Sequence, residues 1–207
     1  MKVILVNGSP DRHGCTATAL AEVAAALERE GIETEMFHIG GKPISGCLGC
    51  GRCRESGRCF IDDCVNDFID RAASADGFVF GSPVYFASAN GAMTAFMDRV
   101  FYAAPREMFF MKPAAAVASA RRAGTTVTLD QLNKYFMITQ MPIVSSQYWN
   151  MVHGNTPDEV RQDLEGLQIM RTLGKNMAYM LRCLEAGRAA GVPLPAREAR
   201  VATNFIR

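Results

Sequence analysis

The sequence predicts an α/β fold, in which a single parallel β-sheet carries helices on both faces. Short apolar runs alternate along the chain with segments whose apolar residues recur at helical spacing. A continuous run such as Val3–Val6 is typical of a strand that is covered on both faces. With 207 residues, the chain is long enough for one α/β domain with a well-buried core. In such a sheet, ligands bind at the carboxyl ends of the strands, where the strand order reverses.

Five apolar runs are predicted to be strands. They are residues 3–6, 33–39, 77–81, 113–119 and 141–145. The second run alternates loosely, which suits a less buried strand near an edge of the sheet. The third is expected to end at Ser82-Pro83. The loops after the first, third and fourth strands are expected to carry the function, and the cysteine-rich loop after the second strand opens on the same edge.

Helices are predicted between these strands. Gly31 stops the first helix, and later ones cover about residues 63–74, 91–103 and 125–139. Thr156 and Glu159 form a capping box around Pro157, and one long helix follows as far as Leu184. We expect a single domain over residues 1–190 with a cysteine-rich insertion at about 40–63. Residues 191–207 are expected to form an extended C-terminal arm that packs on another subunit.

Composition and charge exclude several classes of function. The formal net charge is only +1, so no field of one sign recruits nucleic acid or an acidic membrane surface. No apolar stretch is long enough to span a bilayer, and the N-terminus lacks the layout of a signal peptide. We therefore expect a soluble, cytoplasmic protein. No residue is predicted to be catalytic, because the three histidines share no metal spacing and no nucleophile stands beside a base.

The loop between the first strand and the first helix is predicted to bind an anion. Helix N-termini present unpaired N–H groups and the positive end of a dipole. Ser9 and Thr16 supply hydroxyl donors, Gly14 permits close approach of the backbone, and Arg12 could add charge. The loop lacks G-x-x-x-x-G-K and G-x-G-x-x-G, so a single phosphate, as on FMN, fits better than a pyrophosphate. The alternative is an ordinary strand-to-helix turn capped by Thr16.

Two further loops are expected at the same edge of the sheet. The residues concerned are Pro83, Val84, Tyr85 and Phe86 after the third strand and Ser119, Arg121, Arg122 and Gly124 after the fourth. The aromatic side chains offer a surface for a flat ring. An arginine near the pyrimidine end of a flavin would stabilise the negative charge of the reduced ring. The alternatives are that the aromatic residues belong to the core and that the arginines are a solvated pair.

Four cysteines carry the strongest signal in the sequence. Cys47, Cys50, Cys53 and Cys59 have the spacing C-x2-C-x2-C-x5-C, which lets three thiolates of one turn and a fourth converge on one cluster. A chain without an export signal favours metal or redox chemistry over disulfides. A [4Fe-4S] cluster is the favoured interpretation; a structural zinc site and free, redox-active thiols stay open. Cys64 is expected to be structural and Cys183 to be a small buried hydrophobe.

These motifs resemble those of the NAD(P)H-dependent FMN reductase group of flavodoxin-like proteins, over about residues 1–155. The resemblance rests on Gly8-Ser9-Pro10 through Thr16, on Pro83-Val84-Tyr85-Phe86 and on Asp98-Arg99, and the four cysteines resemble the compact motif of iron-sulfur flavoproteins. It implies strand order 2-1-3-4-5, with FMN at the strand carboxyl ends and its phosphate in the loop that includes Ser9, Pro10, Arg12, Gly14, Cys15 and Thr16. It also implies a homodimer or homotetramer that brings flavin and cluster of neighbouring subunits together. The loop departs from the family at Asp11, where a basic residue is common, and at Cys15, where asparagine is common.

The resemblance and the motifs together predict an FMN-dependent oxidoreductase. Its donor is expected to be NAD(P)H or a ferredoxin-like protein, and its acceptor a small molecule or a protein. FMN accepts electrons in pairs and can release them singly, and a cluster takes one at a time, so together they would convert two-electron transfer into one-electron transfer. A cluster-free NAD(P)H-dependent FMN or quinone reductase, a pure FMN electron carrier and a zinc-binding module remain alternatives. Trp149 is expected to pack at a subunit interface.

Overall fold

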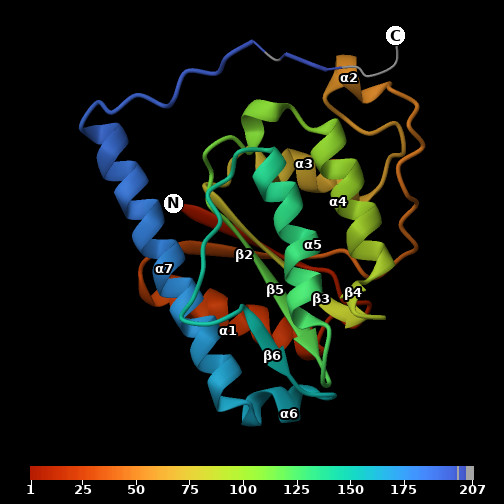
Figure 1. Cartoon of the computed structure of the whole chain (residues 1–207), viewed down its shortest axis with the longest axis vertical. Helices are drawn as coiled ribbons and strands as arrows, with labels where there is room; N and C mark the ends of the chain where they lie inside the picture. Colours follow the sequence, from red (N-terminus) through yellow and green to blue (C-terminus); the bar gives the residue numbers. More distant parts are fainter. Residues whose placement is uncertain (200, 204–207) are drawn as a thin grey trace.

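The computed structural model describes residues 1–199 and 201–203 and places helices on both faces of one β-sheet (Figure 1). Five parallel strands lie in the order β2-β1-β3-β5-β6, and the short β4 pairs antiparallel with β3. This confirms the predicted fold class and, counted over the parallel strands, the order 2-1-3-4-5. The strands are β1 (Lys2–Asn7), β2 (Glu33–His38), β3 (Gly77–Tyr85), β4 (Ser88–Ala89), β5 (Ala114–Ala120) and β6 (Met151–His153).

Helices cover the two faces in separate groups. They are α1 (Cys15–Arg29), α2 (Cys53–Ser56), α3 (Cys64–Ala72), α4 (Gly91–Ala103), α5 (Thr125–Ile138), α6 (Pro157–Gln162) and α7 (Leu164–Ala189), with a 3₁₀ turn, η1, at Arg106–Met108. Side chains of α3, α4 and α5 pack on one face, and those of α1, α6 and α7 on the other. No described helix combines the length and the hydropathy that crossing a lipid bilayer requires.

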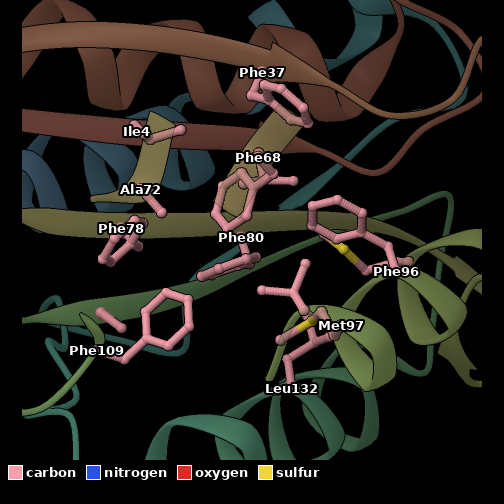
Figure 2. Packing of buried hydrophobic residues seen from close by; sticks show 14 of the residues in the cluster. Ile4, Phe37, Phe68, Ala72, Phe78, Phe80, Phe96, Met97, Phe109 and Leu132 are labelled. Carbon is pink, nitrogen blue, oxygen red and sulfur yellow. The ribbon is translucent and has the colours of Figure 1, made fainter. Parts of the chain in front are cut away.

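The core on the α3/α4/α5 side is a cluster of aromatic rings (Figure 2). Side chains alternate along β3, so Phe78 and Phe80 enter this cluster while Val79 faces α1 and α7. Phe68 of α3 lies with its ring centroid 6.0 Å from that of Phe80 and 5.2 Å from that of Phe96. Neighbouring β5 is mostly alanine and fully buried, which leaves room for these rings.

The strand predicted at residues 141–145 is wrong. Ile143 forms only an isolated bridge with Ala114, and the fifth parallel strand is β6, which pairs with the carboxyl end of β5. Pro142 lacks an N–H to extend a ladder, and a turn at Ser146 then carries the chain away from the sheet. The run therefore touches β5 once before the chain returns to it as β6.

Strand β3 does not end at Ser82-Pro83 but continues to Tyr85 and turns into β4. Phe86 and Ala87 form the turn with φ of 51° and 57°. Two successive left-handed residues are typical of the tight hairpin turn whose twist matches the flanking strands. The aromatic segment after the third strand is therefore a hairpin tip rather than an irregular loop.

The predicted long C-terminal helix is divided into α6 and α7 at Asp163. Thr156 caps α6 as expected, accepting a hydrogen bond from the Glu159 N–H. One carboxylate oxygen of Asp163 accepts from the Gly166 N–H at 2.9 Å and the other from the His153 N–H at 2.7 Å. A carboxylate that caps a helix and holds a neighbouring strand favours a break here over continued helix.

The two outer strands of the sheet are protected in different ways. β6 has only three residues. β2 carries Glu35, which forms ion pairs with Lys2 and Arg71. Beyond α7, residues 191–199 and 201–203 have neither helix nor strand, while residues 200 and 204–207 of the predicted arm lie outside the described part. The single-domain division and the packing of the arm on another subunit stay predictions.

The close contact between α1 and α7 gives a stability prediction. A Cβ at Gly174 would lie 2.6 Å from the Ala26 Cβ and 2.8 Å from the Val23 carbonyl oxygen, so Gly174→Ala should destabilise the fold by roughly 1–3 kcal/mol. In the same helix, a Cβ at Gly187 meets only Val192 at 3.9 Å, and Gly187→Ala should stabilise by up to about 1 kcal/mol. Urea unfolding of both variants measures the two effects, and equal shifts would contradict the packing argument.

Candidate functional site

The loop between β1 and α1 leaves the start of the helix open to an anion. Gly14 is the N-cap of α1, and no described side chain caps its free N–H groups. The alternative, in which Thr16 caps the helix, is wrong, because the Thr16 hydroxyl instead lies 2.7 Å from the Ser119 hydroxyl. Both hydroxyls are buried at the carboxyl edge of the sheet. Two donor groups and a helix terminus thus converge where a phosphate was predicted.

The same loop is shaped by its own side chains. Asn7 accepts a hydrogen bond from the Ser9 N–H at 3.0 Å, and the Ser9 hydroxyl accepts from the Asp11 N–H at 3.1 Å. Asp11 in turn accepts from the His13 N–H at 2.9 Å. The Asp11 carboxylate, at the position where the resemblance leads us to expect a basic residue, is therefore engaged within the loop. The ring of His38, at the end of β2, lies 2.9 Å from the Ser9 carbonyl oxygen and fixes the loop from outside.

Asn90 joins this loop to α4, a link that the sequence analysis missed. Its amide donates to the Gly8 carbonyl at 2.7 Å, while its side-chain oxygen caps α4 through the Met93 N–H. The backbone N–H of Asn90 also donates to the Ser82 hydroxyl at 3.1 Å. An asparagine directly before a predicted helix is the signal that could have identified it.

The two other predicted loops meet beside the anion site. Tyr85 is 47% exposed and Phe86 fully exposed, so the alternative that they belong to the core is wrong. Gly124 has φ +90°, and a Cβ there would lie 2.7 Å from the Ala87 Cα and 2.9 Å from the Val84 side chain. Only glycine allows the loop after β5 to approach the hairpin this closely.

The remaining predicted residues of this edge line its rim. Pro10, Arg12, Arg121 and Arg122 are exposed, and Pro83 is half-buried. The exposure of both arginines is compatible with a solvated pair as well as with flavin contact.

Cys15 begins α1, and its thiol donates to the Gly154 carbonyl at 3.6 Å; burial raises the pKa of this thiol. Trp149, half-exposed just before β6, packs edge-to-face on Tyr148.

The four predicted ligand cysteines line one pocket. Cys53 is buried at the start of α2, Cys59 is half-buried, and Cys47 and Cys50 are exposed. None forms a disulfide, and burial raises the pKa of Cys53, an effect to which the other three thiols add. The chain wraps around them at left-handed glycines, which are Gly49, Gly51 and Gly57. In the described part of the chain, no three acidic, histidine or cysteine side chains are close enough together to hold a metal ion.

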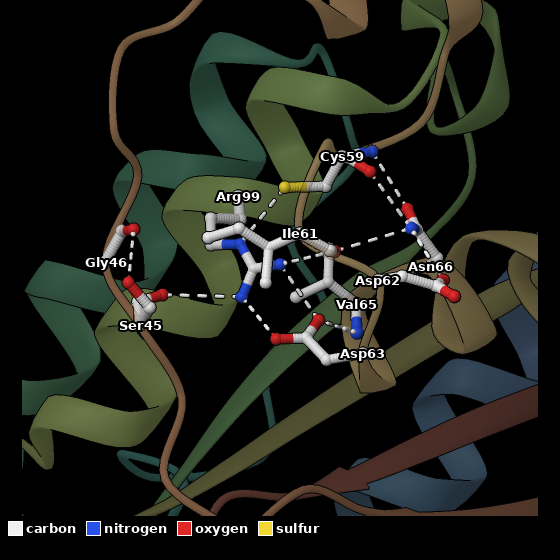
Figure 3. Close-up of polar contacts among 9 residues, drawn as sticks. All are labelled: Ser45, Gly46, Cys59, Ile61, Asp62, Asp63, Val65, Asn66 and Arg99. Atoms are coloured by element: carbon white, nitrogen blue, oxygen red, sulfur yellow. Dashed lines mark hydrogen bonds and ion pairs between the residues drawn. The ribbon is translucent and has the colours of Figure 1, made fainter.

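A buried arginine organises the cysteine segment (Figure 3). The side chain of Arg99, on α4, is fully buried and binds both carboxylate oxygens of Asp63, at 2.6 and 2.9 Å. Its other donors reach the carbonyl oxygens of Ile61 at 3.0 Å and Ser45 at 3.4 Å. Its Nε lies 3.2 Å from the Cys59 sulfur. One guanidinium thus connects a cysteine to the chain on either side of the motif.

Asn66 and Asp63 complete this arrangement from α3. The Asn66 side chain accepts from the Cys59 N–H at 2.8 Å and donates to the Cys59 carbonyl at 3.0 Å. Asp63 also caps α3, accepting a hydrogen bond from the Val65 N–H at 3.0 Å. Burial raises the pKa of Cys64 to about 11, which keeps the thiol protonated and fits its expected structural role. Cys183, in contrast, is exposed rather than buried, because the end of α7 extends beyond the core.

We expected the cysteine-rich loop to open on the same edge of the sheet as the other functional loops, and the positions of the two sites correct this expectation. The cysteine loop leaves β2 at the carboxyl edge of the sheet, but its cysteines do not stay there. Cys53 contacts the Tyr102 carbonyl at 3.9 Å, at the end of α4, whereas Asn90 holds the anion loop at the start of α4. The 12 residue steps between Asn90 and Tyr102 separate the two sites by about 18 Å along the helix axis. Within one chain the two sites therefore occupy opposite ends of α4.

Four basic side chains of the cysteine segment, which could offset the negative charge of a thiolate-bound cluster, are all exposed. Arg52 lies 4.0 Å from the centroid of the Phe60 ring, Arg54 donates to the Tyr102 hydroxyl, and Arg58 pairs with Asp70. Lys42 stands at the beginning of the loop. None of the four lines the thiol pocket, where Arg99 is the basic residue.

The chain is similar to known flavoproteins in sequence and in structure. A model of the NADPH-dependent FMN reductase family matches residues 1–156. An iron-sulfur flavoprotein of Methanocaldococcus jannaschii is 33% identical over 195 residues, which cover 89% of this chain and 100% of the relative. Another, from Archaeoglobus fulgidus, is 29% identical over 196 residues and covers 88% and 98%. A WrbA-like flavodoxin of Agrobacterium tumefaciens has a similar structure, with TM-score 0.63, 17% identity and coverage of 88% and 98%.

The buried ion pair gives a second prediction. Arg99→Met leaves the Asp63 carboxylate without its guanidinium and should destabilise the protein by about 3–5 kcal/mol. Arg54→Met, which removes an exposed guanidinium from the same segment, should change stability by less than about 0.5 kcal/mol. Urea unfolding measures both, and limited proteolysis should show faster cleavage within residues 40–63 of the Arg99 variant alone. Equal stability of the two variants would show that Arg99 does not organise the segment.

Proposed function

We propose that this chain, which belongs to the NADPH-dependent FMN reductase family and within it to the iron-sulfur flavoproteins, transfers electrons by means of FMN and a [4Fe-4S] cluster. The family makes it an FMN-dependent oxidoreductase. One observation carries the finer proposal: four cysteines of one short loop line a single pocket beside a buried guanidinium on a flavodoxin-like domain.

The carboxyl edge of the sheet is where the residues fit FMN. The open N-terminus of α1 and the hydroxyls of Ser9, Thr16 and Ser119 offer donors to a phosphate. The exposed side chains of Tyr85 and Phe86 offer a surface to a flat ring. Bound there, FMN would supply the ability to accept an electron pair and to release the electrons singly. The residues bind and orient; the described geometry requires none of them to act as an acid or a base.

The cysteine pocket fits an iron-sulfur cluster by its donor chemistry. Four thiols and no other ligand type line it together with Arg99, whose Nε lies close enough to the Cys59 sulfur for a hydrogen bond. Hydrogen bonds to ligand sulfur are one of the means by which proteins set the potential of such a centre. When bound, the cluster would take up and release one electron at a time. The exposed positions of Cys47 and Cys50 leave that half of the loop free to close.

The separation of the two sites supports an oligomer as the functional unit. A thiol pocket and a flavin edge about 18 Å apart along α4 are poorly placed for exchange within one chain. A second copy that brings its cysteine pocket to this chain's flavin edge would shorten the path. We therefore propose a homodimer or homotetramer, with NAD(P)H or a ferredoxin-like protein as donor and a small molecule or protein as acceptor.

One observation favours a second candidate function. Because no three of the thiols are close enough together to bind a metal in the described residues, a cluster-free NAD(P)H-dependent FMN or quinone reductase is the alternative. In that case the cysteines would be free or redox-active thiols. Iron content separates the two candidates.

The test of the cluster uses protein purified without oxygen, with iron, acid-labile sulfide and a visible spectrum measured on one sample. We expect about four irons and four sulfides per chain in addition to flavin absorption. Cys50→Ala should lose most of the iron and retain flavin. Cys183→Ala, which removes an exposed thiol outside the loop, should retain both. Flavin absorption without iron in the unmodified protein would favour the cluster-free reductase.

The anion site gives a separate prediction for FMN and riboflavin, which differ only in the phosphate. Two charge-assisted hydrogen bonds of about 1.5 kcal/mol each should make FMN bind at least about a hundredfold more tightly than riboflavin. Thr16→Val should reduce this ratio by roughly tenfold, whereas Thr172→Val on α7 should leave it unchanged. Titration calorimetry of the three flavin-free proteins with each flavin measures all six affinities. An equal affinity for both flavins would place the phosphate elsewhere.

A further inference from the structure

A second cavity lies at the opposite edge of the sheet from the anion site. Its volume is about 490 Å³, within the range of small-molecule sites. Its walls include Asp76 and Pro113, which directly precede β3 and β5, and Leu184 and Arg188 near the end of α7. The arm closes it at Val192–Pro195. None of the residues assigned above to FMN or to the cysteine pocket lines it, so it is a separate site.

The arm forms the roof of this cavity. Figure 1 shows it leaving α7 and running back across the end of the molecule. The Val192 N–H donates to the Gly187 carbonyl at 2.9 Å, which turns the chain directly after the helix. Arg197 then fixes the arm, pairing with Glu107 at 2.7 Å and lying 5.0 Å from the centroid of the Phe110 ring. Such a roof can release and admit a ligand without disturbing the sheet.

Two acids and two cations line the cavity. Glu107 pairs with Arg197 outside it, whereas Asp76 accepts a hydrogen bond from the Lys2 backbone N–H at 2.9 Å and keeps its charge. Among the described residues, neither Lys112 nor Arg188 forms an ion pair.

The half-buried Lys112 is the focus of the cavity's positive charge. Its Nζ donates to the Ala72 carbonyl at 3.4 Å and lies 5.9 Å from the centroid of the Phe78 ring. Burial lowers the pKa of Lys112; Asp76 opposes this effect and Arg188 adds to it. An ammonium with one long hydrogen bond and no carboxylate is a group that an anion would complete.

The remaining wall is apolar, and part of it is strained. Phe110, Met111, Leu181, Leu184, Val192 and Leu194 supply most of the apolar side chains. Met111 has φ +58°, a left-handed conformation that a residue other than glycine adopts at a cost of about 1–3 kcal/mol. Strain of this kind is concentrated at binding sites, where the surrounding structure maintains it.

We propose that this cavity binds a small amphipathic anion, with an apolar body among the side chains of α7 and the arm and a single carboxylate or sulfonate at Lys112. The site is independent of the flavin chemistry proposed above. Two cations without an ion-pair partner in the described part of the chain favour an anionic headgroup over a cationic one, and the apolar walls disfavour a purely polar anion such as inorganic phosphate.

The experiment uses the full chain loaded with FMN, so that the flavin edge is filled. The fluorescent probe is 8-anilino-1-naphthalenesulfonate, which has an apolar body and one sulfonate. We expect one probe to bind per chain, and decanoate to displace it at lower concentration than decanol does, because only decanoate is charged. A probe that binds only in the absence of FMN would place it at the flavin edge and would overturn the proposal.

Two variants and a matched control locate the probe. Gly187→Leu should abolish binding, because a side chain there projects toward Val192 and fills the cavity. Lys112→Met should weaken binding at least tenfold, and Lys175→Met, which removes an exposed lysine of α7, should leave it unchanged. FMN absorption and the thermal unfolding midpoint of each variant report on folding. The proposal is refuted if a folded Gly187→Leu protein binds the probe with full affinity. It is also refuted if the unmodified protein does not bind the probe.

Discussion

A guanidinium taken out of water must be surrounded by acceptors, and this requirement arranges the cysteine segment. Arg99 is buried on α4, and its acceptors are a helix-capping carboxylate, two backbone carbonyl groups and a cysteine sulfur. Those groups belong to the chain before and after the motif, so satisfying one charge fixes the path of the loop at both ends. Removing any acceptor would leave part of a buried charge unmet, which couples the position of Cys59 to the stability of the fold.

The length of α4, the helix that carries Arg99, also sets the distance between the anion loop and the thiol pocket. Its first residues are tied to the anion loop through Asn90, and its last turn contacts Cys53 through Tyr102. A helix is stiff along its axis, so this spacing does not vary with side-chain motion. The fold therefore places the anion loop and the thiol pocket at different ends of α4.

Most of the fold could be predicted from the periodicity of apolar residues. The elements that were predicted wrongly are those whose structure depends on tertiary contacts. The strands β1, β2 and β5 and the helices α3, α4 and α5 were predicted because each has one dominant pattern. The run at 141–145 has the composition of a strand, but β5 can pair with it only at Ile143, and composition does not reveal pairing partners. Asp163 resembles any surface carboxylate until β6 is placed beside it. The cysteine spacing indicated a shared pocket, yet nothing local in the sequence indicated that a buried Arg99 would hold it.

The edges of the sheet determine how copies of this chain can meet. At one side the ladder ends in the three residues of β6, and at the other the outer strand β2 carries Glu35 between Lys2 and Arg71. Neither edge presents the long, uncharged row of backbone groups on which another strand can be added. Association by strand addition, the common route from folded domain to fibril, is thereby disfavoured. Contacts through helix faces, the aromatic hairpin or loops are not restricted in this way, and such contacts can close into a finite oligomer.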